Sequence, residues 1–144
     1  MTGYFVDTNV LLYSLDVRDP AKRAMANAWL EHLWQSRNGR LSWQVLNEFY
    51  SNAVRKMGVP VVQARETVMT FTQWMPVGTS ARLAERAWYW MDEAQVSWWD
   101  SLILASAEQQ GCRWLLSEDF QADRDYEGIR VINPFLQLPE GVSL

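Results

Sequence analysis

Apolar residues recur along the chain in two patterns that alternate from one end to the other. Short apolar runs predict buried strands over residues 4–6, 40–42, 113–116 and 129–132, with a further short strand at Val77. Apolar positions at helical spacing predict a helical turn over 9–15 and helices over 20–36, 43–56, 60–74, 80–94 and 98–110. This alternation is typical of an α/β fold with a mainly parallel sheet and helices on both of its faces.

Residues that commonly begin or end helices support these boundaries. Pro20 follows Asp19, a pair typical of a helix start. Gly58 separates two of the predicted helices, Ser97 is a suitable cap for another, and Gly111 ends it. We find no repeat or long linker, so residues 1–144 are expected to form a single domain.

Composition narrows the classes of protein that remain. The chain has no apolar stretch of the roughly 20 residues that span a bilayer and no signal-peptide pattern, so a cytoplasmic protein without a membrane partner is expected. A net charge of −4 is not the basic footprint of a passive nucleic-acid binder. It does not exclude a nuclease, because carboxylates that hold divalent cations add negative formal charge.

Cys112 and His32 are the only residues of their kinds, which excludes an internal disulfide and a zinc site built on several thiolates. Cys112 lies in an apolar segment and is expected to be a buried thiol. His32 is far in sequence from any nucleophile motif, which disfavours a histidine-based hydrolase. The nine tryptophans are expected mostly to pack in the core rather than to stack on bases.

Two aspartates follow predicted strands. Asp7 comes directly after residues 4–6, and Asp119 lies just past residues 113–116. Ligands of open α/β sheets bind beyond the carboxyl ends of the strands, so both side chains meet at one edge if these strands are neighbours. The alternative for Asp7 alone is that it caps the helical turn that follows it.

Two further carboxylates fall on predicted helices. On a helical wheel Asp100 lies within the apolar arc that includes Trp99 and Ile103, where a charge is costly unless it is paired or binds a metal. Glu48 lies at the border of an apolar stripe, where a solvated glutamate is also ordinary. An oxygen-rich group without Cys or His suits Mg²⁺ or Mn²⁺, cations that serve phosphodiester cleavage.

Five blocks of the sequence resemble the PIN domains of the VapC toxin group. They are residues 5–12 (FVDTNVLL), 44–49 (QVLNEF), 97–103 (SWWDSLI), 115–120 (LLSEDF) and 131–135 (VINPF). The blocks occur in order and span nearly the whole chain. The resemblance implies a three-layer α/β/α PIN-like domain with a mainly parallel central sheet.

The resemblance also implies a site. Its acidic quartet is Asp7, Glu48, Asp100 and Asp119, with Asn9 and Ser117 in support. Asp7 and Asp100 would be the principal metal ligands, and the other two carboxylates would complete the site directly or through water. Asp123 and Asp125 are either a fifth carboxylate or part of a solvated loop.

The implied function is that of a Mg²⁺- or Mn²⁺-dependent endoribonuclease, the toxin of a type II toxin–antitoxin system, with RNA as substrate and a cognate antitoxin as partner. Hydrolysis by water activated at the metal would leave a 5′ phosphate. A homodimer is expected, and the surplus of apolar side chains around Trp88 suggests a surface for it. The basic residues that cluster in sequence, either RNA contacts or solvated faces, are Arg18, Lys22, Arg23, Arg55 and Lys56.

Other readings are weaker or remain open. A dehalogenase-type phosphatase needs a second aspartate two residues after the first, where this chain has Asn9. A flap-type nuclease is larger and carries a helical insertion. A catalytically silent PIN-like module that binds RNA or protein remains the alternative, and it predicts loss of a quartet position, whereas all four are present.

Overall fold

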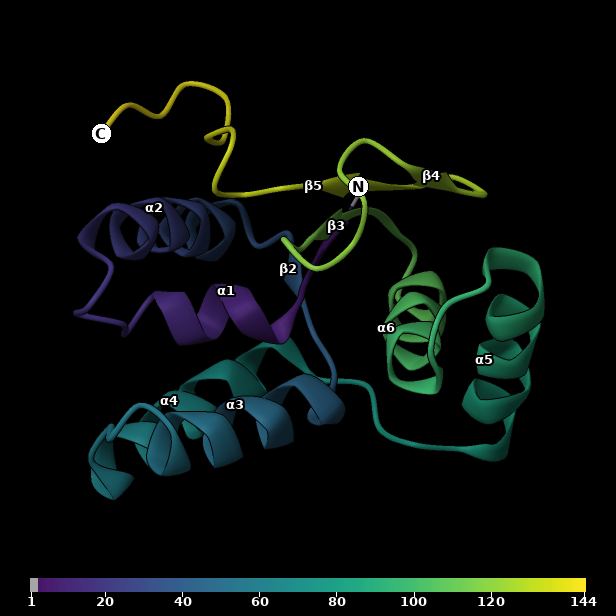
Figure 1. The fold of residues 1–144 in the computed structure, drawn as a ribbon, viewed down its shortest axis with the longest axis horizontal. Coiled ribbons are helices and arrows are strands. Elements are labelled where there is room, and N and C mark those ends of the chain that lie inside the picture. The colour runs from purple at the N-terminus through teal and green to yellow at the C-terminus, as the bar shows by residue number, and fades with distance from the viewer. Residues whose placement is uncertain (1–2) are drawn as a thin grey trace.

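The computed structural model describes residues 3–144, which form a five-stranded sheet covered by helices (Figure 1). The strands are β1 Gly3–Val6, β2 Gly39–Arg40, β3 Cys112–Leu116, β4 Asp125–Tyr126 and β5 Ile129–Ile132, in the order β2-β1-β3-β5-β4. All pairs are parallel except β4 with β5. The expected α/β fold with a mainly parallel sheet is confirmed.

Six α-helices connect and cover these strands. They are α1 Thr8–Tyr13, α2 Pro20–Ser36, α3 Trp43–Arg55, α4 Val61–Phe71, α5 Ala81–Ala94 and α6 Trp98–Gln109, with a 3₁₀ turn at Thr72–Trp74. Side-chain oxygens cap five of the helices by accepting a backbone N–H, at Asp7, Asp19, Ser42, Ser80 and Ser97. Among residues 3–144, no helix is long and apolar enough to cross a membrane.

The strands differ from the predicted ones in three places, for local physical reasons. The strand expected over 40–42 is β2, and it ends at Arg40 because the Ser42 hydroxyl turns to cap α3 at the Val45 N–H, 3.3 Å away. Val77 forms only an isolated bridge to Ser42. The sequence does not predict the hairpin strand β4, because a strand of two residues is too short to show an alternating apolar pattern.

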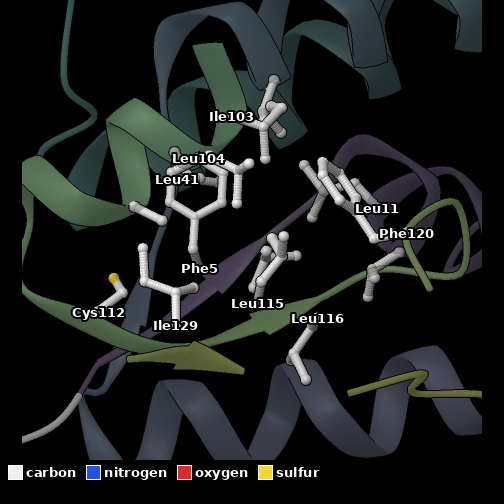
Figure 2. Packing of buried hydrophobic residues seen from close by; sticks show 14 of the residues in the cluster. Phe5, Leu11, Leu41, Ile103, Leu104, Cys112, Leu115, Leu116, Phe120 and Ile129 are labelled. Atoms are coloured by element: carbon white, nitrogen blue, oxygen red, sulfur yellow. The ribbon is translucent and has the colours of Figure 1, made fainter. Parts of the chain in front are cut away.

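Successive side chains of the central strands point to opposite faces of the sheet. Figure 2 shows Phe5 and Leu115 directed toward α6 and Leu116 directed away from it. On the second face the ring of Tyr4 lies 5.8 Å from Trp29 of α2. Apolar burial on both faces therefore fixes the position of β1 and β3 between two helical layers.

The lone thiol and most of the tryptophans pack in or against the core, as the sequence predicts. Cys112 is buried, and burial raises the pKa of its thiol to about 12. Trp43, Trp88 and Trp99 are exceptions, because 39%, 56% and 62% of their surface is exposed. Core packing is therefore the wrong expectation for these three residues.

A close contact at β2 gives a first prediction. A Cβ added to Gly39 would overlap the ring of Trp74, which is itself packed edge-on against Phe71 with ring centroids 4.9 Å apart. We expect Gly39→Ala to lower the free energy of unfolding by about 1–3 kcal/mol, because the Trp74 ring must leave its packed position against Phe71 to make room. Urea denaturation measures this loss.

Gly78→Ala is the matched control, since a Cβ there meets nothing within 4 Å and its backbone is not in the left-handed region. Equal stability of the two variants would contradict the packing argument.

Candidate active site

A small cavity of about 210 Å³ opens beyond the carboxyl ends of β1 and β3. It is lined by Asp7, Thr8, Asn9, Leu12, Gln44, Glu48, Asn52, Trp99, Asp100, Ile103 and Asp119. All four carboxylates of the predicted quartet are among these residues, and no lysine or arginine is. The cavity is therefore a concentration of negative charge without an adjoining protein cation.

Asp7 is held at the point where β1 passes into α1. Its backbone N–H donates to the carbonyl of Leu116 at 3.0 Å, which continues the pairing with β3 by one residue. One carboxylate oxygen accepts the Thr8 N–H at 2.7 Å and the other accepts the Ser117 hydroxyl at 2.7 Å. Asp7 is thus both the cap of α1 and a wall of the cavity, so the two readings of this residue are compatible.

The environment of Asp7 opposes its ionisation. Burial raises the pKa of this carboxyl to about 7, and the negative charges of Asp119 and Glu48 act in the same direction. The hydrogen bonds from Ser117 and Thr8 act against this shift without cancelling it. Without a cation, Asp7 is therefore only partly ionised at neutral pH.

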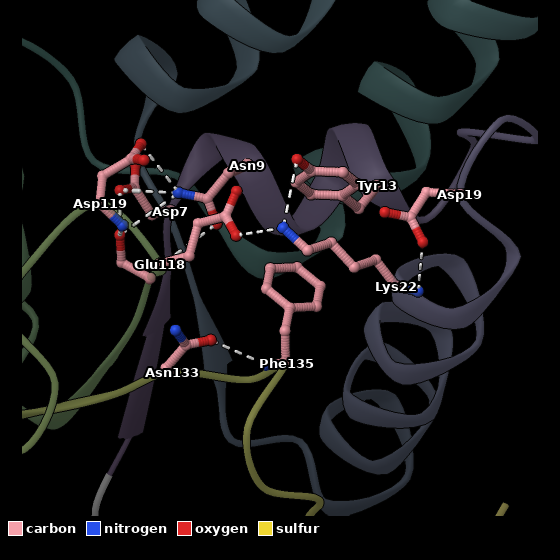
Figure 3. A network of polar contacts seen from close by, with 10 residues as sticks. Asp7, Asn9, Tyr13, Asp19, Lys22, Glu118, Asp119, Asn133 and Phe135 are labelled. Atoms are coloured by element: carbon pink, nitrogen blue, oxygen red, sulfur yellow. Dashed lines mark hydrogen bonds and ion pairs between the residues drawn. The ribbon is translucent and has the colours of Figure 1, made fainter.

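Asn9 links the two strand ends through its side-chain amide, as Figure 3 shows. Its Nδ2 lies 3.4 Å from Asp7 Oδ2, 3.3 Å from Ser117 Oγ and 3.1 Å from Asp119 Oδ2. Ser117 Oγ also accepts the N–H of Asp119 at 3.1 Å. Asn9 and Ser117, which the resemblance names as supporting residues, are thus in contact with two carboxylates of the quartet.

Glu48 and Asp100 reach the cavity from α3 and α6. Glu48 accepts the Thr8 hydroxyl at 3.1 Å, and the N–H of Asp100 donates to the Ser97 cap at 3.1 Å. Burial raises the pKa of both carboxyls, and neighbouring carboxylates add to each shift. Four separate segments of the chain therefore supply one acidic cavity.

The helical wheel was wrong about the neighbours of Asp100. It placed Trp99 on the buried arc and Ser101 on the polar face, yet Trp99 is exposed and Ser101 is buried. Residues 101–107 are all buried, whereas the first turn of α6 is not. Asp100 is half-buried because it faces the cavity from this first turn.

The donor chemistry of the cavity fits a hard divalent cation. Carboxylate, amide and hydroxyl oxygens are the only ligand types that its polar residues offer, and these favour Mg²⁺ or Mn²⁺. Within residues 3–144, no three acidic, histidine or cysteine side chains are grouped closely enough to hold an ion as they stand. The carboxylates line the cavity without converging on one point.

The sequence analysis did not name several lining residues. Gln44 and Asn52 stand one helical turn before and after Glu48, so this spacing alone could have identified them. Gln44 Nε2 donates to the backbone carbonyl of Trp99 at 3.2 Å, which ties α3 to the start of α6. Nothing in the sequence indicates that last contact.

The predicted rim of basic residues does not line the cavity. Arg18 pairs with Asp16 at 2.9 Å. Lys22 Nζ lies 2.7 Å from Glu118 Oε2 and 3.4 Å from the Tyr13 hydroxyl, and Figure 3 shows it held between these two side chains. The remaining three, Arg23, Arg55 and Lys56, are exposed.

The two additional aspartates also lie outside the cavity. Asp123 is exposed. Asp125 belongs to β4 and accepts the N–H of Gly128 at 2.6 Å. Neither residue adds a fifth carboxylate to the lining.

Solved structures with the same fold include a toxin and toxin–antitoxin complexes. VapC20 of Mycobacterium tuberculosis, described as a sarcin-ricin loop cleaving toxin, superposes with a TM-score of 0.61 at 22% identity, covering 84% of this chain and 92% of that one. A toxin–antitoxin complex from Klebsiella pneumoniae gives a TM-score of 0.66 at 22% identity over 92% of this chain and 98% of that one.

DNA-bound VapBC from Salmonella typhimurium gives a TM-score of 0.63 at 16% identity, covering 91% of this chain and 97% of that one. At these identities the likeness shows a shared fold. No curated protein sequence matches the chain. The sequence does match a family described as PIN domain over residues 4–126, which include all four carboxylates of the cavity, and the chain accordingly belongs to the PIN domain family.

Proposed function

We propose that this chain is a metal-dependent endoribonuclease and the toxin of a type II toxin–antitoxin pair. The observation that carries the proposal is the cavity at the carboxyl ends of β1 and β3, where four carboxylates gather without an adjoining lysine or arginine. Burial and mutual repulsion raise the pKa of three of them, Asp7, Glu48 and Asp100. A bound divalent cation would relieve that repulsion.

Asp7 and Asp100 would hold the cation, with Glu48 and Asp119 completing the site directly or through water. When bound, the cation supplies activation of water and stabilisation of the charge that develops on phosphorus. Because the four side chains do not converge as they stand, some of them must turn toward the cation.

The other polar residues of the cavity prepare these carboxylates. Ser117 and Thr8 donate hydrogen bonds that fix the orientation of Asp7. Asn9 donates to the carboxylates of Asp7 and Asp119, and its amide so bridges the two strand ends. Such fixed groups spare the reaction the cost of reorganising them.

The toxin assignment is supported by the solved structures that share the fold, which include a toxin and three toxin–antitoxin complexes. RNA is the proposed substrate because the first of these is described as a toxin that cleaves the sarcin-ricin loop. A cognate antitoxin is the proposed protein partner. A homodimer remains a prediction.

Cleavage of total cellular RNA by the purified protein tests the proposed activity. We expect cuts with Mg²⁺ or Mn²⁺ that leave 5′ phosphates, and none with EDTA. Asp7→Asn and Asp100→Asn should each lower the rate at least about 100-fold, because each removes a ligand charge from the site. Mapping of the RNA ends measures both results.

Asp92→Asn is the matched control, since Asp92 is exposed on α5 and lies outside the cavity. Cutting that survives EDTA, or that persists in either cavity variant, would contradict the proposed chemistry. No cutting in either metal would favour a silent binding module.

The raised pKa of Asp7 gives a prediction for the metal-free protein. Because the folded state favours the protonated acid, the stability that Asp7 contributes is complete below about pH 4 and is lost as pH rises through about 7. In EDTA, Asp7→Asn should therefore raise the free energy of unfolding at pH 8, by up to about 4 kcal/mol, and little at pH 4. Urea denaturation at both pH values measures the difference.

Mg²⁺ should reverse this order at pH 8 by stabilising the wild-type protein more than the variant, since a ligand that binds only the folded state stabilises it. A variant that is no more stable than the wild type at pH 8 in EDTA would show that burial does not penalise the Asp7 charge.

A further inference from the structure

A second cavity, of about 420 Å³, adjoins the acidic one. The two share Gln44, Glu48 and Trp99 in their walls, so each opens beside the other. Apolar side chains such as Leu83 and Leu102 form much of the second cavity's lining. A volume in this range is typical of pockets that receive small ligands or parts of them.

We propose that this second cavity binds one nucleobase of the RNA, next to the phosphate at the acidic cavity, with the Trp99 indole stacked on its face. The inference rests on the proposed function, since it takes the acidic cavity to be where RNA is cut. Trp99 would thereby be a positioning residue that also influences which base is accepted.

Trp99 has the exposure and the support that stacking requires. Although it is a large apolar side chain, 62% of its surface is open to solvent at the boundary between the two cavities. Gln44 fixes the backbone beneath it by donating to its carbonyl at 3.2 Å. An indole placed in this way offers a planar face to a base at little cost in side-chain freedom.

The cavity also contains a polar group without a partner. Ser106 is 1% exposed, and its hydroxyl has no hydrogen-bond partner although it lies in the lining. A buried hydroxyl left in this state is unfavourable, so a ligand edge that bonds to it gains affinity. The side-chain amide of Asn47, which is exposed at the same cavity, offers a further donor and acceptor.

A nucleobase matches this combination better than a segment of a partner protein does. Its faces are apolar and planar, which suits Leu102 and the indole, and its edge carries donors and acceptors, which suits the Ser106 hydroxyl. A base attached to a phosphate at the acidic cavity also reaches the second cavity across the wall that they share at Glu48 and Trp99.

The test measures binding of labelled ten-nucleotide single-stranded RNAs, one homopolymer for each base, by fluorescence anisotropy with Ca²⁺. For the homopolymer that binds best, Trp99→Ala should raise the Kd about 5- to 100-fold. Trp99→Phe should retain most of the affinity. An abasic ribose-phosphate oligomer should bind both the wild-type and the Trp99→Ala protein weakly and equally.

Trp88→Ala is the control, because Trp88 is also an exposed tryptophan, 56% accessible, but lines neither cavity. It should leave every Kd unchanged. Ser106→Ala should alter the ranking of the four homopolymers without abolishing binding, since it changes only the edge contact.

The outcomes separate this inference from the proposed function. If the wild type cleaves RNA while Trp99→Ala leaves Kd and kcat/KM unchanged, the base pocket is refuted and the nuclease stands. If Trp99→Ala weakens binding of the abasic oligomer as much as binding of the homopolymers, stacking of Trp99 on a base is refuted. If the protein binds RNA in a base-dependent way but never cuts it, the base pocket is supported and the proposed nuclease activity is refuted. If it binds no RNA at all, both the base pocket and the nuclease activity are refuted.

Discussion

The parallel pairing of β1 with β3 is the constraint on which the rest of the molecule depends. The register joins Val6 to Leu116, and the next hydrogen bond, from Asp7 to Leu116, carries the pairing past the end of the strand. A slip of one residue would send every side chain of β1 to the other face, so the apolar burial on both faces also fixes the direction of Asp7. The core and the cavity are therefore specified together.

The helices supply the other half of the cavity, and the carboxylates that they bring oppose the stability of the fold. Glu48 on α3 and Asp100 on α6 bring further negative charge to a partly buried space, and the pKa values of both carboxyls are raised. Residues that are placed for function against their own electrostatic preference are common in active sites. Here the surrounding apolar core offsets the cost of these carboxylates, because residues 101–107 of α6 are all buried.

The strand ends could be predicted from the sequence, because an aspartate that directly follows an apolar run is a local signal. Asn9 and Ser117 could be predicted as site residues only through the family resemblance. The exposure of Trp99 could not be predicted, since a periodic pattern shows which face of a helix is apolar but not where the helix extends beyond its neighbours. The contact between Gln44 and Trp99 joins two helices that the sequence separates by 55 residues, a distance over which no periodicity operates.

The acidic cavity draws its walls from segments that are far apart in the chain, since the bond from Asn9 to Asp119 spans 110 residues. A ribosome making this protein therefore exposes β1 and Asp7 long before β3 exists to pair with them. The cavity can be assembled only after α6 and β3 have been synthesised, because Asp100 and Asp119 belong to its lining. A nascent chain that ends before Asp119 therefore contains Asp7 but cannot form the acidic cavity.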